Sequence, residues 1–176
     1  GVKTMTISAG MDISGYLNCS TRTLMPTLAD VKNHVADLED TSDLIILLTH
    51  IGGVINPDIE SIAEFCNRNN IILLEDCAHS FGATFNGKHS GLFGDGGVYS
   101  FYATKAIPAG EGGVAVTKNE DIGKALQLYV MYDRFDQQLD LGVNFRPSEV
   151  QALLMYAVAK EVESIIQNKR EIAAVF

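Results

Sequence analysis

An α/β fold built on a mostly parallel sheet is what this sequence predicts. Two short uninterrupted apolar runs, residues 44–49 and 71–74, have the length and apolar character of buried parallel strands. A helical pattern lies between them, so the segment 44–74 predicts a strand, helix, strand unit. Strand and helix patterns continue along the rest of the chain, which is typical of this fold class.

The first expected helix begins after Thr27. A threonine cap followed three residues later by Asp30 is the signature of a capping box. Apolar residues then recur at helical spacing, namely Leu28, Val31, Val35 and Leu38. The pattern predicts one short amphipathic helix.

The helix between the two apolar runs is marked by Asn56-Pro57-Asp58. These residues fit an N-cap, a proline at the first helical position and an acid in the first turn. The apolar face of this helix comprises Ile59, Ile62, Ala63 and Cys66. Asn69-Asn70 is expected to end it.

The remaining elements follow from turn residues and periodicity. Asn86-Gly87 predicts the turn of a short hairpin, and residues 97–102 and 113–117 are strand candidates. Residues 121–131 predict a helix. From residue 147 to the end, a helical pattern without a breaker predicts one long helix. Its buried stripe is expected to comprise Val150, Leu153, Leu154, Ala157, Val158 and Val162.

Length and composition indicate a globular protein. The 176 residues and 47% apolar content suffice for one ordinary domain with a core. No run of about 18 apolar residues and no secretory signal pattern is present, so we expect a cytoplasmic protein without membrane contact. Cys19, Cys66 and Cys77 are odd in number and lack metal-type spacing, which favours reduced thiols.

The charge balance argues against one class of partner. The chain has 13 Lys and Arg against 22 Asp and Glu, which gives a formal charge of −9. A protein that binds the phosphate backbone of nucleic acids needs a positive surface. We therefore expect no nucleic-acid partner.

An acid and an amine each follow an apolar run in the segment 71–116. Asp76 follows the run 71–74, and Lys105 follows the apolar and aromatic residues 98–103. Two strands could present both groups at one site, because open α/β sheets bind ligands at the carboxyl ends of their strands. This pair suits pyridoxal phosphate (PLP), which needs a lysine to hold it as a Schiff base and an acid to keep its ring nitrogen protonated.

Five motifs in order carry a resemblance to a known family. They are EDCAHSFGA, the pair Gly94-Asp95, SFYATK, GEGG and LGVNFRPSE. Residues 24–176 thereby resemble the nucleotide-sugar aminotransferases of the DegT, DnrJ and StrS type, of PLP fold type I. The resemblance implies a three-layer large domain with a mostly parallel sheet, incomplete at both ends. Residues 1–146 would be part of the PLP-binding domain, and residues 147–176 a long helix leading toward an absent small domain.

The resemblance also implies catalytic residues. Lys105 would form the Schiff base and shuttle a proton, and Asp76 would pair with the ring nitrogen. Without the motifs around it, Lys105 would read as a solvated loop lysine, and Asp76 as a capping or loop aspartate.

Three further residues resemble cofactor contacts. His79 would lie against the ring, Ser100 would bind the phosphate, and Asn144 would reach the phosphate held by a neighbouring subunit, which requires a homodimer. A packed or surface histidine and a loop asparagine are the alternatives for His79 and Asn144. A metal site formed by Asp76, His79, His89 and Asp95 is disfavoured by their spacing.

The function implied is transfer of an amino group, from glutamate, to a keto sugar carried on a nucleotide, as in amino-sugar and cell-surface polysaccharide synthesis. The other hypothesis is a truncated, non-catalytic chain that dimerises but cannot bind PLP productively. Helix N-termini are common anion sites, and the helix that receives the phosphate in the family is expected to precede Gly1.

Overall fold

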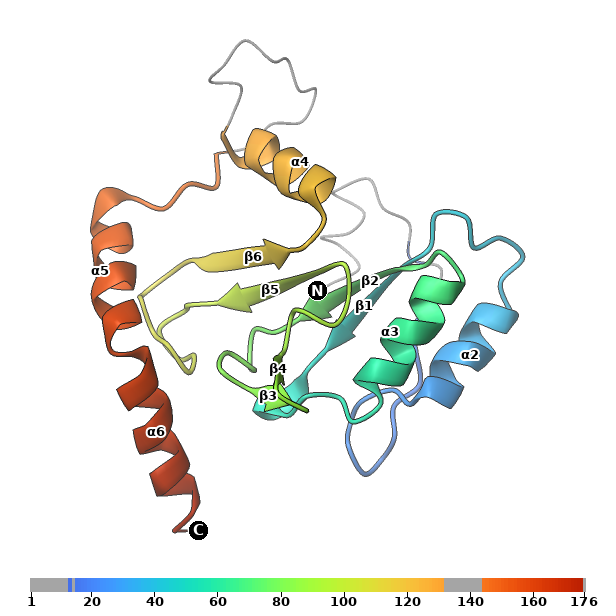
Figure 1. Cartoon of the computed structure of the whole chain (residues 1–176), viewed down its shortest axis with the longest axis horizontal. Coiled ribbons are helices and arrows are strands. Elements are labelled where there is room, and N and C mark those ends of the chain that lie inside the picture. Colours follow the sequence, from blue (N-terminus) through green and yellow to red (C-terminus); the bar gives the residue numbers. More distant parts are fainter. Residues whose placement is uncertain (1–12, 14, 132–143, 176) are drawn as a thin grey trace.

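A four-stranded mixed sheet is the centre of the computed structural model, which describes residues 13, 15–131 and 144–175 (Figure 1). Its strands are β1 (Ile45–Thr49), β2 (Ile72–Asp76), β5 (Gly96–Ser100) and β6 (Gly113–Thr117), in the order β1-β2-β5-β6. β1, β2 and β5 are mutually parallel, and β6 is antiparallel to β5. The predicted mostly parallel α/β sheet is confirmed.

Two helices cover one face of this sheet. α2 (Leu28–Ala36) and α3 (Ile59–Arg68) pack side by side (Figure 1). Their apolar side chains form one core with those of the strands, comprising Val31, Ile46, Leu48, Ile59, Ile62, Cys66 and Leu73. Each fully buried Leu or Ile contributes about 1.5–3 kcal/mol relative to an exposed one, so this cluster is the main source of stability.

The opposite face of the sheet has a different character. Ile45, Leu47, Ile72 and Val98 alternate with the buried residues of their strands and are 40–49% exposed. Of the three expected layers, the described residues form the sheet and the α2–α3 layer over these strands. The face that Asp76 shares is therefore accessible in the described part of the chain.

The start of α2 agrees with the prediction, whereas the start of α3 differs from it. Thr27 and Asp30 form the predicted capping box of α2. The expected N-cap Asn56 is wrong, because α3 begins at Ile59 with Asp58 as its cap residue. Asn56 instead accepts a hydrogen bond from the Asp58 N–H at 2.8 Å and donates to the Pro26 carbonyl at 2.8 Å. The Asn56 oxygen thus makes a local, cap-type bond just ahead of α3, and its amide group makes a tertiary contact with Pro26.

The short elements lie between the strands. The 3₁₀ turn η1 (Ile51–Gly53) follows β1. β3 (Thr84–Phe85) and β4 (Lys88–His89) form the predicted hairpin. Asn86 and Gly87 have φ values of 50° and 79°, so both central residues adopt the positive φ that a type I′ turn requires.

The C-terminal region corrects the prediction of one long helix. After α4 (Glu120–Met131), α5 (Glu149–Lys160) and α6 (Val162–Ala173) are separated at Glu161, whose φ and ψ are −103° and 6°. The two helices contact different turns, since Met155 lies against Gly112 and Ile166 against Gly82. The break has no glycine or proline, so periodicity could not reveal it.

The expected buried stripe of this region is also wrong for α5. No residue of α5 is buried, and Val150, Leu153 and Leu154 are 77%, 68% and 45% exposed. Among the described helices, none has the length and apolar content needed to cross a membrane.

Candidate functional site

Asp76 is the last residue of β2, at the carboxyl end of the parallel strands. It pairs in register with Thr49 of β1 and Val98 of β5. Paired residues of a sheet lie on the same face, and alternate residues of a strand share a face, so Ser100 lies on this side as well. The chain folds this way because Leu73 and Glu75, on either side of Leu74, face the core. The predicted position of Asp76 at the edge of the sheet is confirmed.

Local hydrogen bonds hold the Asp76 carboxylate. Its Oδ1 accepts a bond from the Ala78 N–H at 3.0 Å, and its Oδ2 accepts one from the Thr49 hydroxyl at 3.4 Å. The His50 N–H binds the Asp76 carbonyl at 3.0 Å. Sequence reasoning missed Thr49, although its place at the end of the neighbouring apolar run was a usable signal.

Ser100 and Lys105 lie where β5 leaves the sheet. Ser100 is the last residue of β5, and its Oγ accepts a hydrogen bond from the Tyr102 N–H at 3.3 Å. The Lys105 N–H donates to the Tyr102 carbonyl at 2.9 Å, which forms a turn. The loop closes where the Phe101 N–H binds the Gly112 carbonyl at 2.9 Å. Lys105 is half-buried, and no ion pair within the described residues engages its ammonium group.

Aromatic side chains join the segment after Asp76 to β5. The ring of Phe81 lies edge-on to the rings of Tyr99 and Phe101, with centroid distances of 5.3 and 5.6 Å. Such edge-to-face pairs are favourable in addition to the area they bury. His79 lies in the turn between Asp76 and Phe81 and is exposed, so the structure leaves its ring accessible near this edge.

Asn144 shares no hydrogen bonds with the other candidate site residues in the described part of the chain. It is exposed ahead of α5, and its side-chain oxygen accepts a hydrogen bond from Arg146 Nε at 3.1 Å. Within the described ranges no hydrogen bond joins it to Asp76, Ser100 or Lys105. The first three residues of the motif LGVNFRPSE, 141–143, lie outside the described residues.

A buried pair lies on the other face of the same strand ends. His50 Nε2 and Glu75 Oε2 are 2.9 Å apart, and both side chains are fully buried. His50 Nδ1 accepts a bond from the Asn56 N–H at 3.2 Å, so the proton of a neutral imidazole lies on Nε2 and is donated to Glu75. This pair was not among the predicted site residues, although a glutamate at a core position of a strand is a signal for it.

The loop before β5 supplies the other partners of Glu75. Its two carboxylate oxygens accept bonds from the N–H groups of Gly91, Phe93 and Gly94 at 2.7–2.8 Å. Burial acts to raise the pKa of Glu75, but the hydrogen bonds from His50, Gly94 and Gly91 outweigh it and lower the pKa from its ordinary value of 4.5. Glu75 is thus a buried carboxylate that ties three segments together behind Asp76.

A metal ion does not fit this cluster. His50, Glu75 and Cys77 each offer a ligand atom, and these atoms lie within 4.8 Å of one another. The Glu75 oxygens are occupied by the donors described above. Burial also raises the pKa of Cys77 to about 11, so the thiolate that a metal would bind is harder to form there than at an ordinary cysteine.

The disfavoured metal set around Asp76 is not assembled either. Asp95 accepts a hydrogen bond from the Leu73 N–H at 2.9 Å, near the amino end of β2. Leu73 lies three residues before Asp76, which is roughly 10 Å along a strand. Asp95 and Asp76 are therefore at different ends of the strand.

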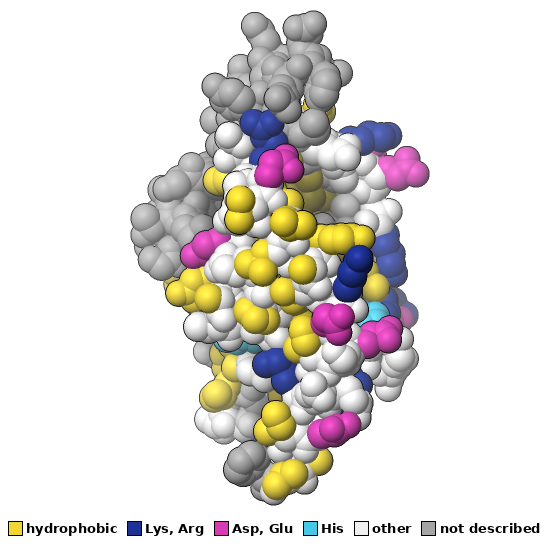
Figure 2. Space-filling view, turned by 90° about the vertical axis from the view of Figure 1, so that its left-hand side faces the viewer, with side chains coloured by type: hydrophobic (Ala, Val, Ile, Leu, Met, Phe, Trp, Pro, Cys, Tyr) yellow, Lys and Arg dark blue, Asp and Glu magenta, His cyan; other side chains and the backbone are white. Residues whose placement is uncertain are grey.

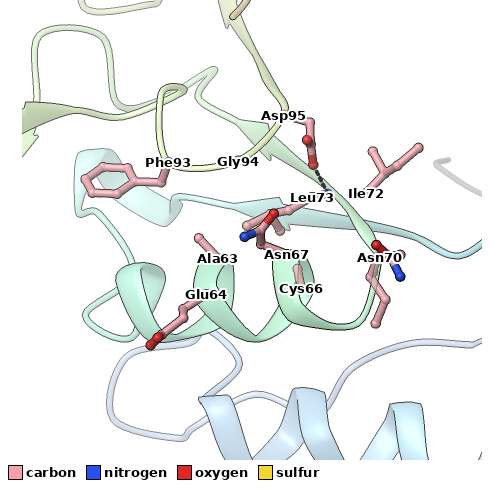
Figure 3. Close-up of a pocket in the computed structure, with 11 residues that line it drawn as sticks. Ala63, Glu64, Cys66, Asn67, Asn70, Ile72, Leu73, Phe93, Gly94 and Asp95 are labelled. Carbon is pink, nitrogen blue, oxygen red and sulfur yellow. Dashed lines mark hydrogen bonds between the residues drawn. The ribbon is translucent and has the colours of Figure 1, made fainter. Parts of the chain in front are cut away.

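A cavity of about 580 Å³ lies at that amino end, between the second half of α3 and the loop before β5 (Figure 3). Asn67, Asn70, Leu73, Phe93 and Asp95 are among the residues that line it. Asp76, Ser100 and Lys105 are absent from its lining. The cavity is separate from the edge of the sheet at which the predicted site residues gather.

Known proteins resemble this chain over nearly its whole length. A model of the DegT/DnrJ/EryC1/StrS aminotransferase family matches residues 11–176. The chain is 29% identical to a GDP-perosamine synthase of Escherichia coli O157:H7, with 99% of the chain and 50% of that protein covered. A GDP-perosamine synthase of Vibrio cholerae is 32% identical, with coverage of 87% and 41%. The chain thus spans about half the length of these relatives, or less.

A solved structure supports the fold. PseC of Helicobacter pylori, an aminotransferase involved in the biosynthesis of pseudaminic acid, superimposes with a TM-score of 0.84 at 21% identity. The alignment covers 97% of this chain and 46% of that protein. At this identity the likeness speaks for the fold, and it agrees with the parallel α/β architecture described above.

Proposed function

This chain belongs to the DegT/DnrJ/EryC1/StrS aminotransferase family, and on that basis we propose that it serves a PLP-dependent transfer of an amino group to a nucleotide-linked keto sugar. One observation carries the proposal. Asp76 and Ser100 end adjacent parallel strands on one face of the sheet, and Lys105 lies in the turn that follows. Glutamate is the proposed amino donor.

The residues at this edge fit the cofactor that the family implies. When bound, PLP withdraws electrons from a substrate carbon, provided that its ring nitrogen is protonated. Asp76 is the residue that would accept the hydrogen bond from that nitrogen. Its carboxylate already accepts two hydrogen bonds, one to each oxygen, and these restrict where the oxygens point.

Lys105 is the residue that would hold the cofactor covalently. Its Nζ would then carry a proton to and from the substrate carbon that loses or gains the amino group. The loop around it is anchored by Ile107 and Ala109, which are 4% and 1% exposed. An amine on an anchored, half-buried loop loses less motion when it reaches a reacting atom than one on a solvated loop does.

Ser100 and His79 would supply further contacts. Because Ser100 Oγ accepts from the Tyr102 N–H, its own hydroxyl proton can point to a phosphate oxygen. The exposed ring of His79 would lie against the cofactor ring. Both assignments are proposals that follow from the resemblance and are compatible with this geometry.

We propose a homodimer in which Asn144 serves the site of the other subunit. Asn144 is exposed and lies in the segment that leads into α5, whose apolar side chains are unburied. Figure 2 shows hydrophobic side chains gathered on the side of the molecule where α5 and α6 lie. Val150, Leu153 and Tyr156, at 77%, 68% and 61% exposure, are among the exposed apolar residues there. A second copy over this side would remove apolar surface from water.

The substrate class is proposed from the relatives. Two of them are GDP-perosamine synthases at 29% and 32% identity, and their names place them in the metabolism of nucleotide-linked amino sugars. The sugar and the aminated position are left open in this proposal. Synthesis of cell-surface polysaccharide in the cytoplasm is the setting that we propose for the reaction.

The test of cofactor binding is chemical labelling of Lys105. The chain is mixed with PLP, the visible spectrum is recorded, the adduct is reduced with borohydride, and the modified peptide is mapped by mass spectrometry. We expect a yellow adduct on Lys105 that Lys105→Ala abolishes. Lys169→Ala is the matched control, because Lys169 lies on the exposed surface of α6 and should not affect the adduct.

A different labelling pattern would contradict cofactor binding at Lys105. Labelling spread over surface lysines, or no adduct at all, would support the other hypothesis, a non-catalytic chain that cannot bind PLP productively. Transfer itself is tested with glutamate and a nucleotide-linked keto sugar, by detecting the amino sugar by mass. Lys105→Ala must abolish any product that forms.

A further inference from the structure

We propose that Thr49 is a positioning residue for Asp76, and that it controls how tightly the ring nitrogen of the cofactor is held. The inference rests on the proposed function. Thr49 ends β1 and lies directly opposite Asp76, with which it shares a register position. Its hydroxyl donates to Asp76 Oδ2 across 3.4 Å.

The need for such a residue follows from the torsions of aspartate. Rotation about the last side-chain bond of aspartate is broad, so hydrogen bonds determine where the two oxygens point. The Ala78 N–H holds only Oδ1 of Asp76, at 3.0 Å. With this one contact the carboxylate could still swing about the bonded oxygen, and Thr49 is the donor that holds the second oxygen.

Thr49 is well suited to this task. A β-branched side chain is stiff at χ1, so its hydroxyl keeps a defined direction. The next residue, His50, holds the backbone carbonyl of Asp76 through its N–H at 3.0 Å. Residues at the end of β1 therefore donate hydrogen bonds to both the main chain and the side chain of Asp76.

The contact leaves room for the cofactor. Each carboxylate oxygen accepts about two hydrogen bonds, so Oδ2 can accept from Thr49 and from a ring N–H together. Both Thr49 and Asp76 are half-buried and lie on the face away from α2 and α3. A ligand on this face can therefore reach the carboxylate without displacing the threonine.

The experiment compares Thr49→Val with Thr49→Ser in the full chain. Valine keeps the shape of threonine and removes the donor, whereas serine keeps the hydroxyl. Affinity is measured for PLP and for the analogue in which the ring nitrogen is replaced by carbon. We expect Thr49→Val to weaken PLP binding by about five-fold. The expected loss is modest because the bond from Thr49 to Asp76, at 3.4 Å, is long for a hydrogen bond to a charged group. Thr49→Ser should bind PLP nearly as the unaltered chain does.

The carbon analogue shows whether the effect runs through the ring nitrogen. It has no ring N–H for Asp76 to accept, so Thr49→Val should leave its affinity unchanged. Equal loss for both ligands, or no loss for PLP, overturns the role of Thr49 while the proposed function stands. If the unaltered chain forms no adduct at Lys105, both proposals fail together.

Discussion

His50 Nε2 donates a hydrogen bond of 2.9 Å to Glu75, and neither side chain has any exposed surface. Glu75 immediately precedes Asp76, and His50 immediately follows Thr49. The two strand ends thus carry a buried pair on one face of the sheet and the candidate site on the other. The buried pair fixes the backbone from which Asp76 projects.

Glu75→Gln is expected to lower the free energy of unfolding by about 2–4 kcal/mol. The amide offers one acceptor oxygen in place of two, so at least one of the N–H groups of Gly91, Phe93 and Gly94 loses its partner in the core. Urea unfolding monitored by circular dichroism measures the change. Glu64→Gln is the matched control, because Glu64 is exposed and should cost less than about 0.5 kcal/mol. Equal effects of the two substitutions would contradict the account of Glu75.

Stability should fall in mild acid because of Glu75. Its pKa in the folded chain is lowered from 4.5, so the stabilisation is fully present above pH 4.5 and is lost as the pH falls through the lowered value. Urea midpoints recorded from pH 6 to pH 3 test this. The unaltered chain should lose more stability over this range than Glu75→Gln does, since the glutamine cannot be protonated there. Parallel curves would assign the acid sensitivity to other carboxylates.

Gly97→Ala should destabilise the fold through a collision of backbone atoms. A Cβ at Gly97 would lie 2.4 Å from Gly91 Cα, so the loop that binds Glu75 must move. We expect a cost of about 3 kcal/mol, as for overpacking of a close-packed interior. Gly87→Ala separates collision from strain, because Gly87 has a φ of 79° but no atom within 4 Å of its added Cβ. Gly87→Ala should lower the free energy of unfolding by only about 1 kcal/mol, measured by thermal or urea unfolding.

Caps and turns could be predicted from the sequence more reliably than contacts between distant segments. The capping box at Thr27 and the Asn86-Gly87 turn depend on neighbours within a few residues, so local patterns suffice. Asp76 was placed at the carboxyl end of a strand because an apolar run precedes it, and the structure has it there. Ser100 was named only through the family resemblance, since a serine in a strand carries no signal of its own.

The missed features depend on contacts between distant segments. Glu75 binds His50 and a loop more than a dozen residues later in the chain, and only the folded chain brings these groups together. The bond from Asn56 to Pro26, 30 residues earlier in the chain, is likewise not visible in a local pattern. The break at Glu161 was missed because no glycine or proline marks it in the sequence.

The three cysteines should differ in reactivity. Cys19 is exposed, whereas burial raises the pKa of Cys66 and of Cys77 to about 11. An aromatic disulfide reagent consumes thiolate, so one thiol of the native chain should react quickly and three in urea. Thiolate release followed by absorbance measures this, and Cys19→Ser should abolish the fast phase. A second fast thiol in the native chain would contradict the burial of Cys66 and Cys77.

Shared active sites predict complementation between two defective chains. Lys105→Ala removes the attachment point, and Asn144→Ala removes the proposed contact to the phosphate in the other subunit. In a mixed dimer, the Asn144→Ala chain has an intact lysine and a partner with an intact Asn144. At limiting PLP we therefore expect strong borohydride labelling of Lys105 on the Asn144→Ala chain only after the two variants are refolded together. Mass spectrometry identifies the labelled chain. If co-refolding labels this chain no better than refolding it alone, each site is built from a single chain and Asn144 does not reach across.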